Sequence, residues 1–149
     1  MEFDRPGTDV GSQVNDISRH RLVIAAIAGA LAVLIGAFGA HLLPDRLVEI
    51  GVDAETLPRR LAQFDTGARY HLAHAVVLLA LVALPVRASA ALRWSFWLFL
   101  AGIVLFSGSL YVLVLTNTPW LGAITPIGGT CWIVAWILLA FLQPSSRKE

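Results

Sequence analysis

Four long apolar stretches constrain the fold of this chain more than any other feature of its sequence. They run from Leu22 to Leu43, Tyr70 to Leu84, Leu92 to Leu115 and Trp120 to Leu142, and they are almost free of charge. A helix needs about 20 apolar residues to cross a hydrocarbon core of about 30 Å, and the shorter second stretch gains length if flanking arginines extend toward the headgroups. The sequence therefore predicts an all-α integral membrane bundle with four transmembrane helices, at about 22–43, 70–86, 92–115 and 120–142.

The overall composition agrees with a protein that is solvated by lipid. The chain is 57 % hydrophobic and only 14 % charged, too apolar for a soluble domain of this length to cover with polar surface. Its net charge of +1 provides no basic field, so no nucleic-acid partner is expected. The expected partner is membrane lipid. Cys131 is the single cysteine, which excludes an internal disulfide and a cysteine-based metal site.

The polar ends of the chain and its basic residues predict the topology. Residues 1–18 show no helical or strand period and are expected to be a disordered cytoplasmic tail, 19–143 the membrane domain, and 144–149 a second cytoplasmic tail. Cytoplasmic segments carry an excess of Lys and Arg, which predicts a protein of the cell (inner) membrane with both termini in the cytoplasm. The basic residues divide seven against four: Arg5, Arg19, Arg21, Arg87, Arg93, Arg147 and Lys148 against Arg46, Arg59, Arg60 and Arg69.

The connection between the first two spans contains a helical pattern. Leu57, Leu61, Phe64 and Ala68 recur at spacings of four, three and four, which places them on one face of a helix, and Pro58 suits its first turn. This pattern predicts an interfacial amphipathic helix at about 57–69, lying on the membrane before the second span.

Small residues predict where helices pack closely. Ala28, Ala32, Gly36 and Ala40 share one face of the first span, and such faces let helix backbones approach in lipid. This face could pack inside the bundle, or against a second copy or another membrane protein. In the fourth span Gly128 and Gly129 could likewise serve packing, or with Pro126 could mark a broken helix that lines a polar cavity.

Polar residues gather toward the non-cytoplasmic ends of the spans. Polar side chains inside a membrane are costly, so their convergence is a site hypothesis. Three interpretations remain open: structural hydrogen bonding, which is favoured; transport or proton handling; and, as a minority interpretation, ligation of a metal, haem or quinone. The candidate cluster contains His41, His74, Ser107, Ser109, Tyr111 and Thr125, with His71 as a weaker member.

No catalytic residue is assigned. Ser107 and Ser109 do not match a nucleophile elbow, and no Asp or Glu lies within the predicted spans. We therefore expect a non-enzymatic membrane component that interacts through small-residue helix faces. The alternative is small-molecule, ion or cofactor binding or transport at the polar cluster, and an enzyme is favoured least. No cofactor or metal is assigned.

Several segments carry a family resemblance: residues 36–41 (GAFGAH), Tyr70 followed by His74, residues 105–111 (LFSGSLY), and residues 125–129 (TPIGG) with Trp136. Together they resemble the bacterial domain of unknown function 423 family over Leu22 to roughly Phe141, and animal transmembrane protein 256 is similar to that family. The resemblance implies a small inner-membrane protein with about four helices and no established activity. Family members commonly have Gln at the position of His71, and their connection corresponding to 44–65 is shorter.

Overall fold

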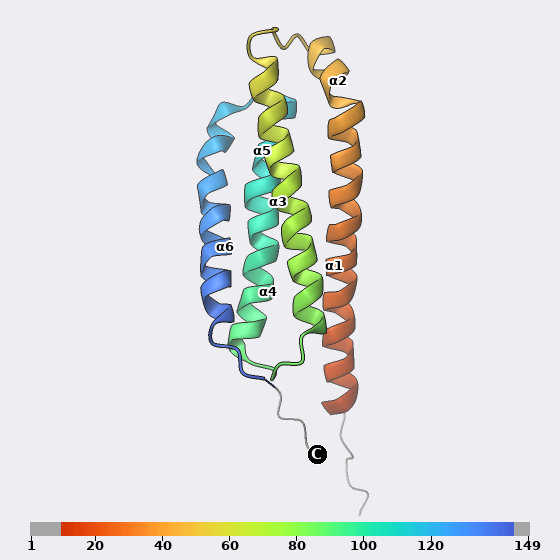
Figure 1. Cartoon of the computed structure of the whole chain (residues 1–149), viewed down its shortest axis with the longest axis vertical. Coiled ribbons are helices and arrows are strands. Elements are labelled where there is room, and N and C mark those ends of the chain that lie inside the picture. The colour runs from red at the N-terminus through yellow and green to blue at the C-terminus, as the bar shows by residue number, and fades with distance from the viewer. Residues whose placement is uncertain (1–9, 145–149) are drawn as a thin grey trace, which may run out of the picture.

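The computed structural model describes residues 10–144, with side chains from residue 18 onward, and contains four helical spans (Figure 1). Segments 18–41, 57–83, 90–116 and 119–139 are long and apolar enough to cross a membrane. The predicted all-α bundle of four transmembrane helices is confirmed. The elements are α1 (Val10–His41), α2 (Leu43–Glu49), α3 (Leu57–Ala83), α4 (Ala90–Gly102), η1 (Ile103–Gly108), α5 (Ser109–Thr116), η2 (Pro119–Ala123) and α6 (Thr125–Leu139).

Helix α3 occupies the middle of the bundle, because it packs on α1 on one side and on the α4–η1–α5 span on the other (Figure 1). Helix α6 is outermost on the far side and packs mainly on α4 and η1. The core between these helices includes Leu78, Phe96, Phe99 and Trp132. Helix α1 is held mainly by α3, so most of its circumference faces outward.

The third span changes its helical geometry in the middle. Its α-helical ends, α4 and α5, are joined by the π-helical segment η1, with helical backbone angles at both junctions. Ser89 begins the span as N-cap, its hydroxyl accepting a hydrogen bond from Leu92 N at 3.1 Å. The span ends at Asn117, which has left-handed backbone angles (φ 52°, ψ 45°) typical of a helix C-terminus. A π-helical turn is wider than an α-helical one and is frequent at functional sites.

The segment expected to form an interfacial helix is helical, but it is the first half of α3 and continues directly into the second span. Its apolar stripe does not face lipid headgroups, since Phe64 is buried with Leu57 and Leu61 packed around it. The partners are Leu43 and Leu47 of α2, a short helix that the sequence analysis did not predict, and the end of α5. The amphipathic pattern was identified correctly, but protein rather than membrane surface covers it.

Helix α1 begins at Val10, within the segment expected to be a disordered tail, and residues 1–9 and 145–149 lie outside the described part of the chain. Val10, Val14 and Ile17 recur at spacings of four and three, a helical pattern that the prediction passed over. Extending an existing helix needs no new nucleus, so the first span can continue into a polar segment.

Candidate functional site

His71 of α3 joins three helices. Its Nδ1 lies 3.3 Å from the hydroxyl of Tyr111 on α5, and its ring also contacts the backbone of Ala28 on α1. A neutral imidazole satisfies both contacts, because one nitrogen donates to the carbonyl while Nδ1 accepts from the phenol. Ser107 Oγ is fully buried near the Tyr111 hydroxyl and has no hydrogen bond of ordinary geometry. This group links α1, α3 and the third span.

His74 belongs to a separate aromatic cluster. Its Nδ1 donates to the backbone carbonyl of Tyr70 at 2.8 Å, and its ring stacks on Trp132 of α6 with centroids 3.8 Å apart and planes within 2° of parallel. Tyr70 stacks on the same indole at 5.6 Å. The Trp132 indole N–H donates to the Phe99 carbonyl of α4 at 3.1 Å. The cluster therefore ties α3 and α4 to α6.

A third polar contact lies between α5 and α6. Ser109 Oγ donates to the Phe106 carbonyl at 2.9 Å and lies 2.8 Å from Thr125 Oγ1. Next to it, Gly128 approaches Phe106 so closely that an added Cβ would meet the Phe106 backbone nitrogen, with Leu105 C at 2.9 Å. The segments 105–111 and 125–129 thus pack on each other, at the π-helical turn.

His41 does not join the other histidines. It is exposed at the end of α1, whereas His71 contacts Ala28, thirteen residues earlier on that helix. At 1.5 Å per residue this is a separation of about 20 Å along α1. His74 lies one turn beyond His71, farther still from His41. A shared ligand between His41 and His74 is therefore not supported by this geometry.

His71 and His74 lie deeper in the bundle than expected. Ala28, which His71 contacts, is near the middle of the 18–41 span rather than at its C-terminal end. The difference arises because α3 begins at Leu57, so that His71 is already four turns into its helix. Among the described residues, no three His, Cys, Asp or Glu side chains are grouped closely enough to hold a metal ion.

The predicted packing residues divide between buried and open positions. Ala28 and Ala32 are buried, and Gly128 allows the close contact with Phe106. Gly129 is less constrained, since an added Cβ would lie 3.8 Å from the Phe106 ring. Gly36 and Ala40 line a cavity of about 230 Å³ between α1 and α3, and an added Cβ at Gly36 would meet no atom within 4 Å.

Three structurally important residues were missed. Gly102 admits the Trp132 indole, and Gly67 lies where an added Cβ would come within 2.9 Å of Tyr111 Cε1. Both are isolated glycines inside helical patterns, a signal of close packing that was available in the sequence. Arg60, used only in the count of basic residues, is 7 % exposed. Its guanidinium donates to Leu113 O at 2.9 Å and to Asn117 Oδ1, and so caps the C-terminal end of α5.

Comparison with known proteins places the chain in a family. Residues 35–129 match the model described as protein of unknown function (DUF423). The chain belongs to the DUF423 family. The resemblance noted from the sequence is confirmed, and the match covers both the 105–111 and the 125–129 segments that pack at the π-helical turn. No solved structure matches the chain.

Curated relatives cover most of this DUF423 protein. UPF0382 membrane protein YwdK of Bacillus subtilis is 40 % identical over 79 % of this chain and 90 % of its own length. UPF0382 inner membrane protein YgdD of Escherichia coli is 38 % identical over 82 % of this chain and 87 % of its own. A UPF0382 membrane protein of Haemophilus influenzae is 36 % identical over 85 % and 95 %. Together with the four candidate spans, these relatives identify a membrane protein of an uncharacterised family.

Proposed function

We propose that this DUF423 protein is a non-enzymatic component of the inner membrane that binds another transmembrane helix through an open face of α1. The face consists of Ala26, Gly29, Val33, Gly36 and Ala40, which we name the open α1 face. Its residues are spaced by three and four, the spacing of a seam between two helices. The inner-membrane location follows the name of the Escherichia coli relative, and the excess of basic residues supports termini in the cytoplasm.

The observation that carries this proposal is the open space beside two glycines. An added Cβ on Gly29 or Gly36 would meet nothing within 4 Å, whereas Ala25, Ala28 and Ala32 on the neighbouring face are buried. The small residues packed against α3 are thus used within the bundle, whereas the glycines beside them border open space, Gly36 at the unfilled cavity that it lines with Ala40. In lipid, where apolar burial does not drive helix association, a smooth face favours close backbone contact with a partner.

The polar cluster gives less support to the alternative of ligand binding or transport. His71 and His74 both bond to backbone carbonyls or to Tyr111, and Trp132 covers a face of the His74 ring. These contacts fix the relative positions of α1, α3 and α6, and a ligand would have to displace them. Structural hydrogen bonding accounts for these contacts without a ligand.

The test compares the variant Gly36→Leu with Ala30→Leu, an exposed position about 120° around α1 from Gly36. Complexes of the full chain are isolated from native membranes in mild detergent and their masses are measured. We expect the wild type and Ala30→Leu to retain a defined oligomer or partner that Gly36→Leu loses, with circular dichroism unchanged in all three. A monomeric wild type in every mild extract, or equal retention by both variants, contradicts the proposal.

A further inference from the structure

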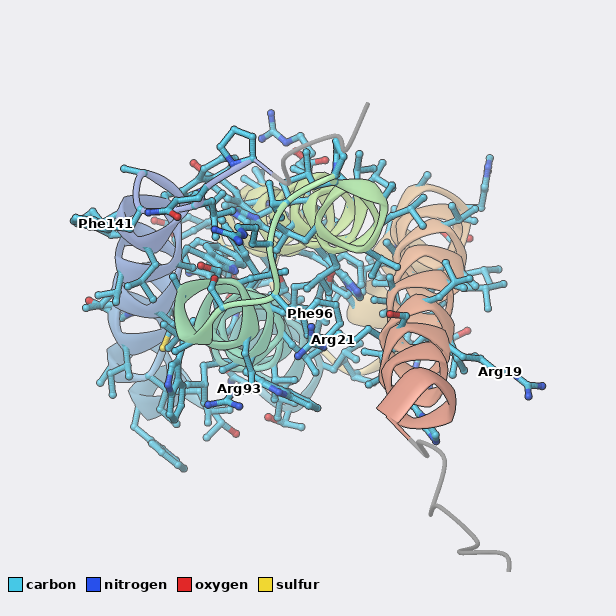
Figure 2. All side chains as sticks on the ribbon, turned by 90° about the horizontal axis from the view of Figure 1, so that it is seen from below. Arg19, Arg21, Arg93, Phe96 and Phe141 are labelled. Carbon is cyan, nitrogen blue, oxygen red and sulfur yellow. The ribbon has the colours of Figure 1, made fainter. Side chains whose placement is uncertain are left out.

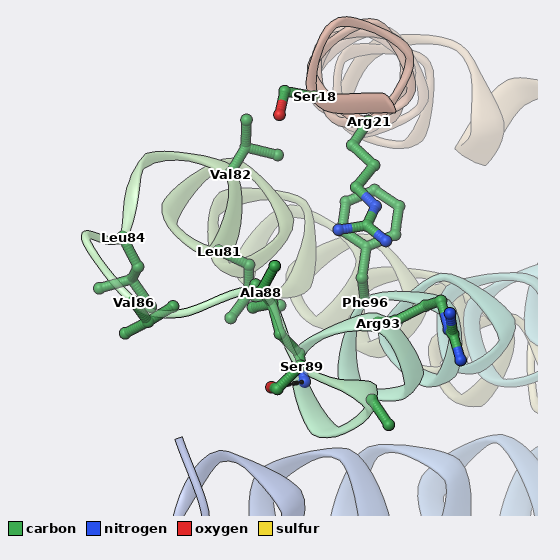
Figure 3. Close-up of a pocket in the computed structure, with 12 residues that line it drawn as sticks. Ser18, Arg21, Leu81, Val82, Leu84, Val86, Ala88, Ser89, Arg93 and Phe96 are labelled. Atoms are coloured by element: carbon green, nitrogen blue, oxygen red, sulfur yellow. Dashed lines mark hydrogen bonds between the residues drawn. The ribbon is translucent and has the colours of Figure 1, made fainter. Parts of the chain in front are cut away.

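A cavity of about 540 Å³ lies at the end of the bundle where the α3–α4 connection passes the start of the first span (Figure 3). Its polar lining comes from Arg21 and Ser18 on α1 and from Arg93 and Ser89 at the start of α4. Its apolar lining includes Leu81 of α3 and Phe96 of α4. Ligand-binding cavities commonly have this size and this combination of apolar walls with a few polar groups.

Among the side chains that the structure describes, residues 18–144, the two arginines of this cavity have no acidic partner. The ion pairs found within residues 18–144 are Arg46–Glu49 and Arg69–Asp65, and no Asp or Glu lines the cavity. The Arg21 guanidinium instead lies over the Phe96 ring, 5.6 Å from its centroid (Figure 3). This cation–π contact holds the guanidinium inside the cavity before any ligand arrives, which reduces the entropy lost on binding. Arg19, two residues earlier, points away from the bundle (Figure 2).

We propose that this cavity binds the phosphate of an anionic phospholipid between Arg21 and Arg93. Guanidinium groups offer paired N–H donors that match phosphate oxygens, and two of them can donate to both non-bridging oxygens of a phosphodiester. Ser18 and Ser89 add hydroxyls at the same rim. The N-terminal end of α4, at Ala90, contributes a weaker positive potential to the same place.

The position of the cavity favours a lipid over a free anion. Arg21 and Arg93 each lie three residues inside a candidate span, 18–41 and 90–116, near the helix end that meets the headgroups if the segment crosses a hydrocarbon core of about 30 Å. Helix α1 packs on α3 and not closely on α4, so acyl chains can reach the cavity sideways from the bilayer. The apolar walls contributed by Leu81 and Phe96 suit an acyl chain and offer nothing to a hydrated phosphate ion.

The experiment measures lipid binding to the full chain by native mass spectrometry, using phosphatidylglycerol and phosphatidylcholine with identical acyl chains. We expect wild type to bind phosphatidylglycerol about tenfold more tightly, and a double variant with Arg21→Gln and Arg93→Gln to lose that preference, since a charge-assisted contact supports a change of this size. The matched control Arg19→Gln removes one positive charge from the same end of α1 and should keep the preference. An equal loss in Arg19→Gln, or no preference in wild type, overturns the proposal.

Two further measurements separate lipid binding from phosphate binding and test Arg93 by itself. A large excess of inorganic phosphate should leave phosphatidylglycerol binding unchanged; if phosphate displaces the lipid, the lipid assignment is wrong. Should the double variant fail to fold, Arg93→Gln alone serves, because that side chain is exposed. We expect the single variant to reduce the preference about threefold, the effect of losing one of two charged contacts, and an unchanged preference would overturn the role of Arg93.

Discussion

Gly128 and Gly129 are adjacent on α6, yet the structure gives them different surroundings, and replacing each by Ala tests the packing at the π-helical turn. An added Cβ at Gly128 meets the Phe106 backbone nitrogen, Phe106 Cβ at 2.8 Å and Leu105 C at 2.9 Å. An added Cβ at Gly129 lies 3.8 Å from Phe106 Cδ2, an ordinary contact. The two variants add the same methyl group one residue apart, so they separate packing from helix propensity.

The expected magnitudes follow from these contacts. Replacing Gly by Ala within a helix stabilises it by about 1 kcal/mol, and this contribution is the same for both variants. Carbon atoms in contact prefer about 3.5–4.0 Å, so Gly128→Ala must push α6 away from η1. Overpacking of this kind costs about 1–3 kcal/mol, and the upper part of that range applies because two of the obstructing atoms belong to the backbone. Gly128→Ala should therefore be less stable than Gly129→Ala by about 2–3 kcal/mol.

The assay is equilibrium unfolding of the two variants and wild type in mixed micelles, with increasing sodium dodecyl sulfate, followed by far-ultraviolet circular dichroism. We expect Gly129→Ala to unfold at or above the wild-type midpoint and Gly128→Ala clearly below it. Loss of the Ser109–Thr125 hydrogen bond, 2.8 Å in the wild type, should accompany the shift of α6. Equal midpoints for the two variants would refute the argument that Gly128 is needed for close packing at Phe106.

Three other predictions concern hydrogen bonds. Arg60→Lys keeps the buried charge, but an ammonium group cannot reach both Leu113 O and Asn117 Oδ1. The free energy of unfolding in mixed micelles should therefore fall by about 1–2 kcal/mol. No change would mean that the bond to Asn117 contributes nothing. Tyr111→Phe removes the hydroxyl beside His71 and should lower the same free energy by about 0.5–1.5 kcal/mol; a more stable variant would contradict the bond. Asp53 lies outside the spans. The Thr56 backbone N–H, and to a smaller extent the Thr56 hydroxyl, donates to the Asp53 carboxylate and holds its pKa below the ordinary 3.8. The ionised carboxylate therefore stabilises the fold at neutral pH, and this stabilisation is lost as the pH falls through the lowered pKa. A carboxyl-carbon NMR titration of Asp53 with a midpoint at or above 3.8 would contradict it.

The four spans could be predicted because the lipid hydrocarbon requires apolar side chains along the whole length of a helix that crosses it. A helix that crosses a membrane must be long and apolar, and hydropathy records both properties directly. The continuity of α3 could not be predicted in the same way. The stripe of Leu61 and Phe64 has the same spacing whether it faces headgroups or protein, and only the unforeseen helix α2 decides which occurs. Periodicity identifies a covered face without identifying what covers it.

The arrangement of the candidate cluster could not be predicted from the sequence. The sequence shows how far His41, His71 and His74 lie along their helices, but not how α1 and α3 are shifted against each other. The contact of His71 with Ala28 fixes that shift and separates His41 from the others by about 20 Å. The π-helical turn was also unpredictable, since a single extra residue in a turn leaves no periodic signal in the six residues of η1.

The two proposed interactions both involve α1, and the packing of the bundle explains why. The motifs at 105–111 and 125–129 join the third and fourth spans tightly, and α3 completes that unit through His74 and Trp132. Helix α1 is attached to α3 along one face only, which leaves both the open α1 face and the Arg21 cavity unfilled. Arg21 and Gly36 are fifteen residues apart, about 22 Å along the helix, so the two sites cannot share a single partner group. Gly36→Leu should therefore leave the lipid preference intact, and the double arginine variant should leave the oligomer intact. If either variant abolished both, α1 would act as one binding surface and the two proposals would have to be replaced by a single one.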